Sequence, residues 1–287
     1  MRSAYHVREF DVWRLMQLSG SLDVMLSHDW PRGVHRHGNE RSLLSRKRFL
    51  EKEVQTNTLG NPHTPAIMSH LKPKYWFSAH LHTKFAAVVP HGSPDGQRTK
   101  FLSLDKCLPQ RDFLQIVSFP AASPGQGKVR LEYDMEWMAI LRATQPYLSV
   151  ERRPPPLPPA TSLHAKVQEE LAWVKAQVEA DSNWLAIPEN FEVTLPPHRP
   201  GVKLPRSQPA FVPNPQTITF TRKIEVPLPH ERTGSQGGAV VSMPMPVLVQ
   251  ESNPDEIDID DSDDPDAVER TGIIQAKNGD EIDIDDV

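Results

Sequence analysis

Two histidines flank a single leucine where an apolar run ends, in the stretch WFSAHLHTKF at residues 76–85. Short apolar runs bounded by polar residues are typical of buried strands, and we expect a strand at residues 75–80. Side chains two residues apart on a strand share one face and lie about 6 to 7 Å apart. His80 and His82 would therefore suit two ligands of one metal ion, or one ligand on each of two neighbouring ions.

A further histidine follows another predicted strand, in the string LSHDWP at residues 26–31. Because ligands of α/β sheets bind at the carboxyl ends of strands, we expect His28 to lie near His80 and His82. Neutral imidazoles bind Zn²⁺, Fe²⁺ and Mn²⁺, and carboxylates usually complete such sites. The pattern predicts a metal site formed by the three histidines. Asp29 either orients His28 through a hydrogen bond or begins the following turn.

Basic side chains follow the predicted ligands in the sequence. Lys84 and His91 are candidates for contact with a phosphate group. Further candidates of this kind are His35, His37, Lys106 and Arg111. For all of them, a solvated surface position is the alternative.

Two other metal-site patterns do not fit the sequence. The string HLHTKF lacks the Asp-His pair that completes the HxHxDH pattern of metallo-β-lactamases. Amidohydrolases carry HxH on the first strand of a long barrel, for which the proline-rich second half of this chain leaves no room.

The elements that must position these residues alternate between helix and strand. The spacing of apolar residues predicts helices at residues 5–18, 39–54, 66–71, 136–143 and 163–178. Strands are expected at residues 22–26, 75–80, 85–89, 101–104, 113–119 and 129–133. This order is typical of the α/β class, with antiparallel strands in the later part. The helix at 163–178 carries one apolar stripe, so it should pack against the body of the protein.

The charge of the chain is uneven, although its formal net value is only −5. Residues 251–287 contain 15 acidic and two basic residues, a net charge of −13, which leaves +8 on residues 1–250. A basic body is compatible with a polyanionic partner. Seventeen of the 29 prolines lie within residues 151–250. We therefore expect an extended linker at residues 152–160 and mostly disordered chain from residue 196.

Cysteine usage and hydropathy exclude several classes of protein. Cys107 is the only cysteine, so the sequence contains neither a disulfide framework nor a thiolate metal cage. The first residues do not resemble a signal peptide, and the apolar stretch at 238–249 is too short and proline-rich to span a bilayer. These features predict a soluble cytosolic or nuclear protein.

Three strings in the sequence resemble the RNA lariat debranching enzymes, which belong to the calcineurin-like metallophosphoesterases. They are LSHDWP, LKPKYWFSAHLHTKFAA and TKFLSLDKCLPQRDFLQIV, within a similarity from about residue 3 to residue 144. Weaker similarity continues in NPQT (214–217) and NPDEIDIDD (253–261).

The resemblance implies a two-metal centre of Fe, Zn or Mn that hydrolyses the 2′–5′ phosphodiester at the branch point of excised introns. It implies that His28 and His80 bind one metal ion and that His82 binds the other. Branched (lariat) RNA would be the substrate. The implied location is the nucleus, and shuttling to the cytoplasm stays open.

The sequence also departs from this family. Family members begin with a strand that carries a D-x-H or C-x-H pair, followed by GD and GNHE motifs, none of which is found here. The string Gly38-Asn39-Glu40 lacks the histidine. The expected fold is the C-terminal half of a metallophosphoesterase αββα sandwich at residues 1–90, a debranching-specific region at 97–225 and a disordered acidic tail at 226–287. Without the GNHE histidine no catalytic residue is assigned, and this chain alone should bind metal weakly and show little or no turnover.

Two alternatives stay open at this point. In the first, the chain is a non-catalytic isoform or fragment that acts as an interaction module, through its C-terminal region and acidic tail. The DEIDIDD repeats at 255–261 and 280–286 would then bind spliceosome or intron-turnover proteins. In the second, the chain belongs to a metallophosphatase for another phosphodiester, which the debranching-type strings after His82 disfavour. No membrane partner is expected.

Overall fold

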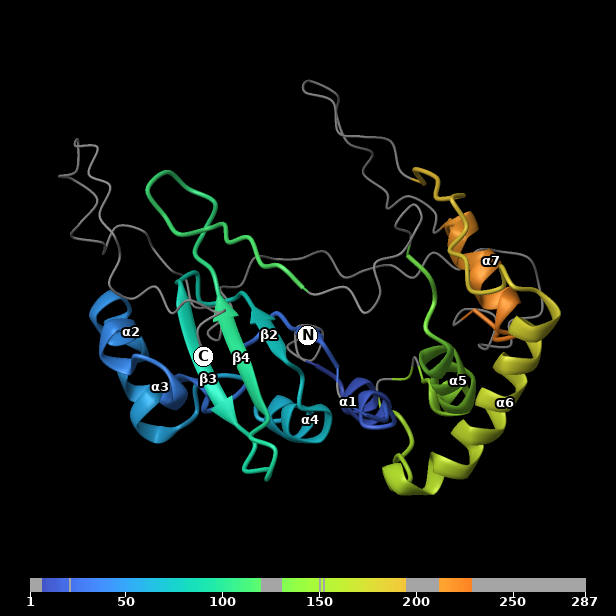
Figure 1. Ribbon diagram of the computed structural model, residues 1–287, viewed down its shortest axis with the longest axis horizontal. Helices are drawn as coiled ribbons and strands as arrows, with labels where there is room; N and C mark the ends of the chain where they lie inside the picture. Colours follow the sequence, from blue (N-terminus) through green and yellow to red (C-terminus); the bar gives the residue numbers. More distant parts are fainter. Residues whose placement is uncertain are drawn as a thin grey trace. The chain divides into compact units, whose positions relative to one another are not determined.

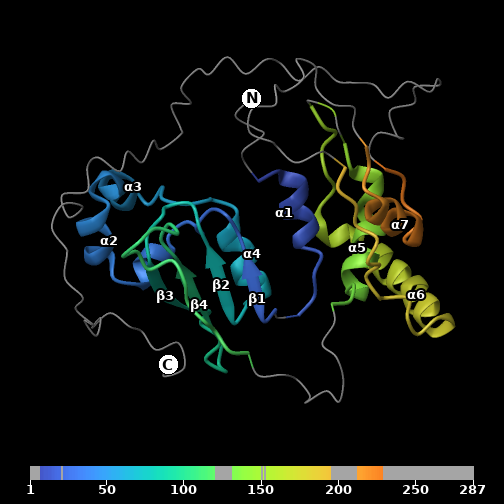
Figure 2. The same ribbon diagram turned by 90° about the horizontal axis from the view of Figure 1, so that it is seen from above.

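The histidine-bearing strand ends belong to a four-stranded sheet of order β1-β2-β4-β3, of which Figure 1 labels β2, β4 and β3 and Figure 2 labels all four strands. The computed structural model describes residues 7–20, 22–119, 131–149, 151, 153–194 and 212–228. The strands are β1 (Val24–Leu26), β2 (Tyr75–Ser78), β3 (Phe85–Pro90) and β4 (Arg98–Ser103). β1, β2 and β4 run parallel, whereas β3 is antiparallel to β4. Helices lie between the parallel strands β1 and β2, and β3 connects β2 to β4, so the sheet is mixed and the predicted α/β class is confirmed.

One face of this sheet forms the main apolar core. Met25, Trp76, Phe101 and Ala87 are paired across the four strands, so their side chains form one row on that face. Trp76 at the centre of the row is fully buried. Helices on the same core are α2 (Glu40–Arg46), α3 (Glu51–Thr56) and α4 (Thr64–Leu71), which contribute Leu43, Val54 and Ile67.

The helix predicted at residues 39–54 is interrupted. The backbone leaves the helical region at Lys47, with φ −133° and ψ 66°, and a 3₁₀ turn at Arg48–Leu50 then leads into α3. Leu43 before the break and Leu50 after it are both fully buried in the same core. The prediction of one continuous helix was wrong. With the break, both leucines are buried in the apolar core.

The string Gly38-Asn39-Glu40 has a structural role at the start of α2. A Cβ atom on Gly38 would lie 2.3 Å from the Ala86 carbonyl oxygen of β3, so only glycine fits there. Asn39 caps α2 by accepting a backbone hydrogen bond at 3.0 Å. Glu40 pairs with the buried His35, whose Nδ1 lies 2.8 Å from its carboxylate. None of these contacts involves a metal ligand.

Two further strands were predicted wrongly or only in part. Residues 113–119 form no strand, and Ile116 is 87% exposed. In the region predicted at 129–133, residues 129 and 130 lie outside the described chain, and Glu132 forms only an isolated bridge with Ala186. Apolar, β-branched residues form a strand only where a neighbouring strand can pair with them. Residues 113–119 favour a strand by their types, but no neighbouring strand pairs with them among the described residues.

A helical cluster of α5 (Met135–Thr144), α6 (His164–Ala180) and α7 (Pro215–Lys223) forms a second region of packing (Figure 2). Met138 of α5, Val174 of α6 and Ile224 after α7 are fully buried against one another. The prediction that the helix at 163–178 packs on the body is confirmed. α7 is an ordered element within the region from residue 196 that we expected to be mostly disordered, and most of that region lies outside the described residues. Asn214 caps α7 and Pro215 is its first residue, which places the NPQT string at a helix start.

Helix α1 (Glu9–Leu15) joins this cluster to the proline-rich linker. Trp13 packs with Ile140 of α5 and Val167 of α6, and its indole N–H donates to the Pro158 carbonyl at 2.8 Å. Residues 153–159 have no regular secondary structure, as expected for the linker. The acidic tail beyond residue 228 lies outside the described residues.

None of the helices in the described part of the chain is both long enough and apolar enough to cross a lipid bilayer.

Arg142 connects the three helices of the cluster. Its Nε donates to Glu170 of α6 at 2.6 Å, its Nη1 donates to the Ile224 carbonyl at 2.5 Å, and its guanidinium lies 3.6 Å from the ring centre of Trp173. Burial raises the pKa of Glu170, but hydrogen bonds from Lys166 and Arg142 outweigh that effect, so the pKa lies below its usual value. The pair is thus ionised and buried.

We predict that Arg142→Gln lowers the free energy of unfolding by about 2 to 3 kcal/mol. Removing one partner of a buried ion pair costs about 3 to 5 kcal/mol, and Lys166 reduces the cost here because it still pairs with Glu170. Urea denaturation followed by circular dichroism measures the change. The control is Lys175→Gln on the exposed face of α6, which should change the stability by less than about 0.5 kcal/mol. Equal effects of the two variants would contradict the prediction.

Candidate metal centre

Hydrogen bonds between side chains hold the carboxyl ends of β1 and β2 together. The Trp76 indole N–H donates to the Ser27 hydroxyl at 2.9 Å, and that hydroxyl donates to the Asp29 carbonyl at 2.7 Å. Ser78 at the end of β2 donates to the same carbonyl at 3.2 Å. The backbone of Asp29 is therefore fixed from both strands, although its side chain stays free to accept other partners.

The residues just after β2 are held by a second group of contacts. The Trp30 indole N–H donates to the Ala79 carbonyl at 2.9 Å, and the Ser103 hydroxyl approaches the same oxygen at 3.5 Å. The backbone N–H of Ala79 donates to the His28 carbonyl at 3.0 Å. We refer to these contacts of Ser27, Asp29, Trp30, Trp76, Ser78 and Ala79 as the strand-end network. It fixes His28 and His80 next to one another.

His28, Asp29 and His80 converge beside this network. The Nδ1 atom of His80 lies 3.1 Å from Nε2 of His28 and 3.6 Å from the Asp29 carboxylate. The two rings meet edge to face, with centres 4.9 Å apart. One ligand atom from each residue lies within 4.8 Å of the others, and both histidines are exposed to solvent. The expected convergence of His28 and His80 is present, and Asp29 contributes its carboxylate.

These distances fit a divalent metal ion. Two imidazole nitrogens at about 2.0 to 2.1 Å from a tetrahedral Zn²⁺ ion lie about 3.3 Å apart, close to the 3.1 Å between His28 and His80. The nitrogen and carboxylate donors suit Zn²⁺, Mn²⁺ and Fe²⁺. Within the described residues, only these three meet as a possible ligand group.

The backbone at His80 and His82 is not that of a strand. β2 ends at Ser78, and the two histidines have φ values of 66° and 47°, a region that residues other than glycine seldom adopt. The Leu81 N–H donates to the Ala79 carbonyl at 2.8 Å, two residues back, which is the pattern of a γ-turn centred on His80. The expectation that His80 and His82 share a strand face was therefore wrong.

Burial alternates along the segment that contains this turn. Leu81, Thr83 and Phe85 are almost fully buried, whereas His80 is exposed and His82 is half-buried between them. Strained backbone of this kind costs about 1 to 3 kcal/mol per residue and is concentrated at functional sites. The strain thus points to His80 and His82 as residues with a function, on evidence separate from their type.

His82 does not belong to the three-residue ligand group. Its Nδ1 atom is buried without a hydrogen-bond partner. Burial lowers the pKa of His82, and the nearby charges of Lys106 and Lys47 lower it further. The ring is thus kept neutral, as a metal ligand must be.

The other predicted site residues lie elsewhere. Lys84 is half-buried beyond the γ-turn, and its carbonyl accepts a hydrogen bond from Arg46 at 3.0 Å. His91 follows the opposite end of β3, and its Nε2 lies 2.7 Å from the Thr99 hydroxyl. Arg111 pairs with Asp105 at 3.5 Å. The structure therefore does not bring His91 to the metal group.

The sequence does not reveal the residues of the strand-end network as functional. Ser27, Ser78 and the two tryptophans are ordinary strand and core residues by type. The signal that could have identified them is the position of each, within four residues of a predicted ligand.

Comparison with known proteins shows to which family this chain belongs. Residues 96–229 match the family model described as "Lariat debranching enzyme, C-terminal domain". The lariat debranching enzyme of Schizosaccharomyces pombe is 33% identical over 337 aligned positions, which cover 90% of this chain and 69% of that protein. The chain belongs to the lariat debranching enzyme family. This confirms the resemblance of the LSHDWP and FSAHLHTKF strings.

Vertebrate members of the family are more similar but longer. The Danio rerio lariat debranching enzyme is 44% identical over 225 residues, which cover 76% of this chain and 39% of that protein. The Homo sapiens enzyme is 42% identical over 236 residues, covering 79% of this chain and 42% of that protein. The chain thus spans about two fifths of the length of these lariat debranching enzymes.

We predict that the 287-residue chain binds one Zn²⁺ ion weakly and that His28→Ala and His80→Ala each abolish this binding. Each substitution leaves only one imidazole beside the Asp29 carboxylate, which is too few ligands for a stable zinc site. Isothermal titration with ZnCl₂ measures the affinity. The matched control is His63→Ala, because His63 is exposed and lies outside the ligand group. Binding that is unchanged in the His28 and His80 variants would exclude this site.

Proposed function

We propose that this chain supplies part of a metal-dependent phosphodiesterase site that hydrolyses the 2′–5′ phosphodiester of branched RNA. The observation that carries the proposal is the meeting of His28, Asp29 and His80 at strand ends, in a chain of the lariat debranching enzyme family. A pair of divalent ions at such a site supplies Lewis acidity and lowers the pKa of bound water. The metal would be Zn²⁺, Mn²⁺ or Fe²⁺.

The roles of the chain's own residues follow from their geometry. His28 Nε2 and His80 Nδ1 face one another and would bind one metal ion, with the Asp29 carboxylate beside His80. His82, half-buried and neutral, would bind the second ion. The strand-end network would keep these groups in place without itself touching the substrate.

We also propose that the chain alone turns over slowly or not at all. Within the described residues, only two histidines and one carboxylate come together, and the sequence contains no GNHE histidine. A two-metal site needs ligands on both sides of each ion, including a group that bridges them. Those ligands would come from a polypeptide with the D-x-H or C-x-H, GD and GNHE motifs.

We predict that the 287-residue chain leaves a synthetic 2′–5′ branched RNA uncleaved, and that a chimera carrying the missing motifs linearises it. The assay is gel electrophoresis of the labelled RNA with Mn²⁺, Fe²⁺ or Zn²⁺ added. In the chimera, His80→Ala should lower the rate at least 100-fold, because one ligand of the metal ion is lost. The control His63→Ala should keep the rate within about twofold. Efficient cleavage by the unmodified chain, or full activity of the His80 variant, would refute the proposal.

An interaction module is the second candidate function. The observation in its favour is the same incomplete ligand group, combined with a separately packed helical cluster in the region that matches the family's C-terminal domain. In this case the acidic tail at 251–287 would bind nuclear proteins of RNA processing. Metal binding without cleavage, both by the chain and by the chimera, would favour this candidate.

A further inference from the structure

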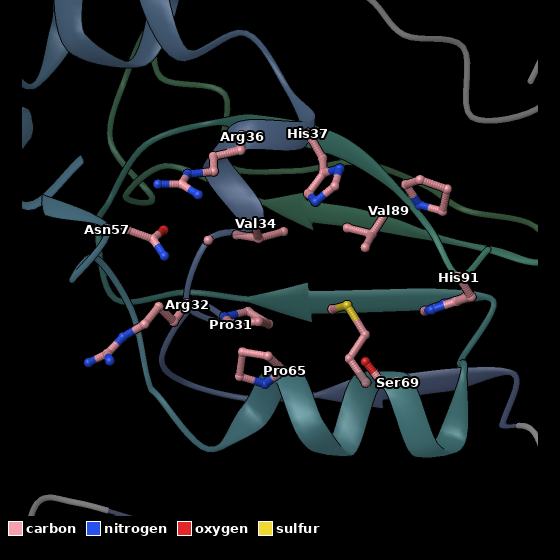
Figure 3. Close-up of a pocket in the computed structure, with 13 residues that line it drawn as sticks. Pro31, Arg32, Val34, Arg36, His37, Asn57, Pro65, Ser69, Val89 and His91 are labelled. Carbon is pink, nitrogen blue, oxygen red and sulfur yellow. The ribbon is translucent and has the colours of Figure 1, made fainter. Parts of the chain in front are cut away.

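A cavity of about 360 Å³ lies beside α4, and no residue of the metal group lines it (Figure 3). Its walls are the segment that follows LSHDW, one side of α4 and the end of β3. The volume equals that of about twelve water molecules in the liquid, at about 30 Å³ each. It lies in the range of cavities that hold small organic ligands, about 300 to 1,000 Å³, and greatly exceeds the needs of a single inorganic ion.

One end of the cavity is cationic. Figure 3 shows the side chains of Arg32, Arg36 and Asn57 together at this end. The Nε atom of Arg32 and the side-chain oxygen of Asn57 are buried, and neither has a hydrogen-bond partner. Among the described residues, no carboxylate forms an ion pair with either arginine. Two guanidinium groups without an acidic partner are the arrangement that binds phosphate.

The acidic side chain nearest to Arg36 in the sequence is already engaged. Glu40 pairs with His35, which is buried behind the 3₁₀ turn Val34–His37 that carries Arg36. It therefore does not neutralise the cationic end. A buried donor such as the Arg32 Nε atom normally has a partner, so its lack of one indicates a site for an external acceptor.

The other end of the cavity is lined by the end of β3 and one side of α4. Val89 and His91 of the β3 end face Ser69 of α4 across it in Figure 3. The Thr99 hydroxyl donates its hydrogen to the Pro73 carbonyl, so His91 must donate from Nε2 to Thr99, and the ring is held in one orientation. Burial and the charge of Lys72 lower the pKa of His91, which keeps this end uncharged. Fixed, neutral rings with apolar neighbours are surfaces on which nucleobases stack.

We propose that this cavity binds a nucleoside monophosphate, with its phosphate on Arg32 and Arg36 and its base against Val89 and His91. The site is independent of the proposed debranching function, since it uses none of the metal-binding residues. The same chemistry is presented by a free nucleotide and by the 5′-phosphorylated end of an RNA strand. The shared feature is a phosphomonoester attached to a nucleoside.

The test is isothermal titration of the 287-residue chain with adenosine 5′-monophosphate in low salt. We expect saturable binding that weakens at least tenfold in Arg32→Gln and in Arg36→Gln, because each removes a charged partner of the phosphate. Adenosine without phosphate should also bind at least tenfold more weakly. The matched control is Arg41→Gln on exposed α2, which removes the same charge outside the cavity and should leave the affinity within about twofold.

Two further measurements complete the test. Arg36 is exposed, so Arg36→Gln should keep the far-ultraviolet circular dichroism and melting temperature of the unmodified chain, which separates lost binding from lost folding. A double variant, His28→Ala with His80→Ala, should bind the nucleotide normally even if metal binding is lost. Absence of nucleotide binding, or equal binding by the Arg36 and Arg41 variants, would overturn the proposal.

A 5′-phosphorylated RNA pentamer identifies the source of the ligand. At least tenfold tighter binding than adenosine 5′-monophosphate would support the site and assign it to RNA ends. Equal affinity would support the site and assign it to free nucleotides. A pentamer without the 5′ phosphate that binds as tightly as the phosphorylated one would contradict the role of the two arginines.

Discussion

The candidate metal centre depends on hydrogen bonds that join the end of β1 to the end of β2. Two parallel strands pair over only a few residues here, and β1 has just three. Indole N–H groups of Trp30 and Trp76 extend the contact beyond the backbone ladder, into the residues where the ligands begin. Each of the two tryptophans is almost fully buried, so the same side chains serve the apolar core and the site. Loss of core packing would therefore also displace His28 and His80.

Much of this arrangement could be predicted from the sequence. Apolar runs followed by histidines indicated strand ends, and the parallel order of β1 and β2 brings the two ends to one edge of the sheet. The convergence of His28 and His80 follows from these two facts alone. Asp29 could be predicted as a neighbour of the site, although the choice between a hydrogen-bond role and a turn role required coordinates.

The geometry at His80 and His82 could not be predicted, because the apolar run before them favours a continuing strand and a positive φ is uncommon for any residue other than glycine. The chain turns at these residues while Leu81, Thr83 and Phe85 stay buried, and that burial depends on contacts between distant parts of the chain. The break at Lys47 has the same origin. α7 was missed for the opposite reason: its nine residues lie among prolines, where composition predicts disorder, and only packing against α5 and α6 stabilises so short a helix.

Arg142 also has a consequence for the order in which the protein is completed during synthesis. The arginine precedes its acceptor at Ile224 by 82 residues. At a translation rate of about 5 to 20 residues per second, the ribosome needs about 4 to 16 s to add them. After residue 180, in the second half of that interval, α5 and α6 have both been synthesised, but one donor of the guanidinium that links them has no partner. The helical cluster can therefore reach its final packing only late in translation or after release, whereas every strand of the sheet has been synthesised before Arg142.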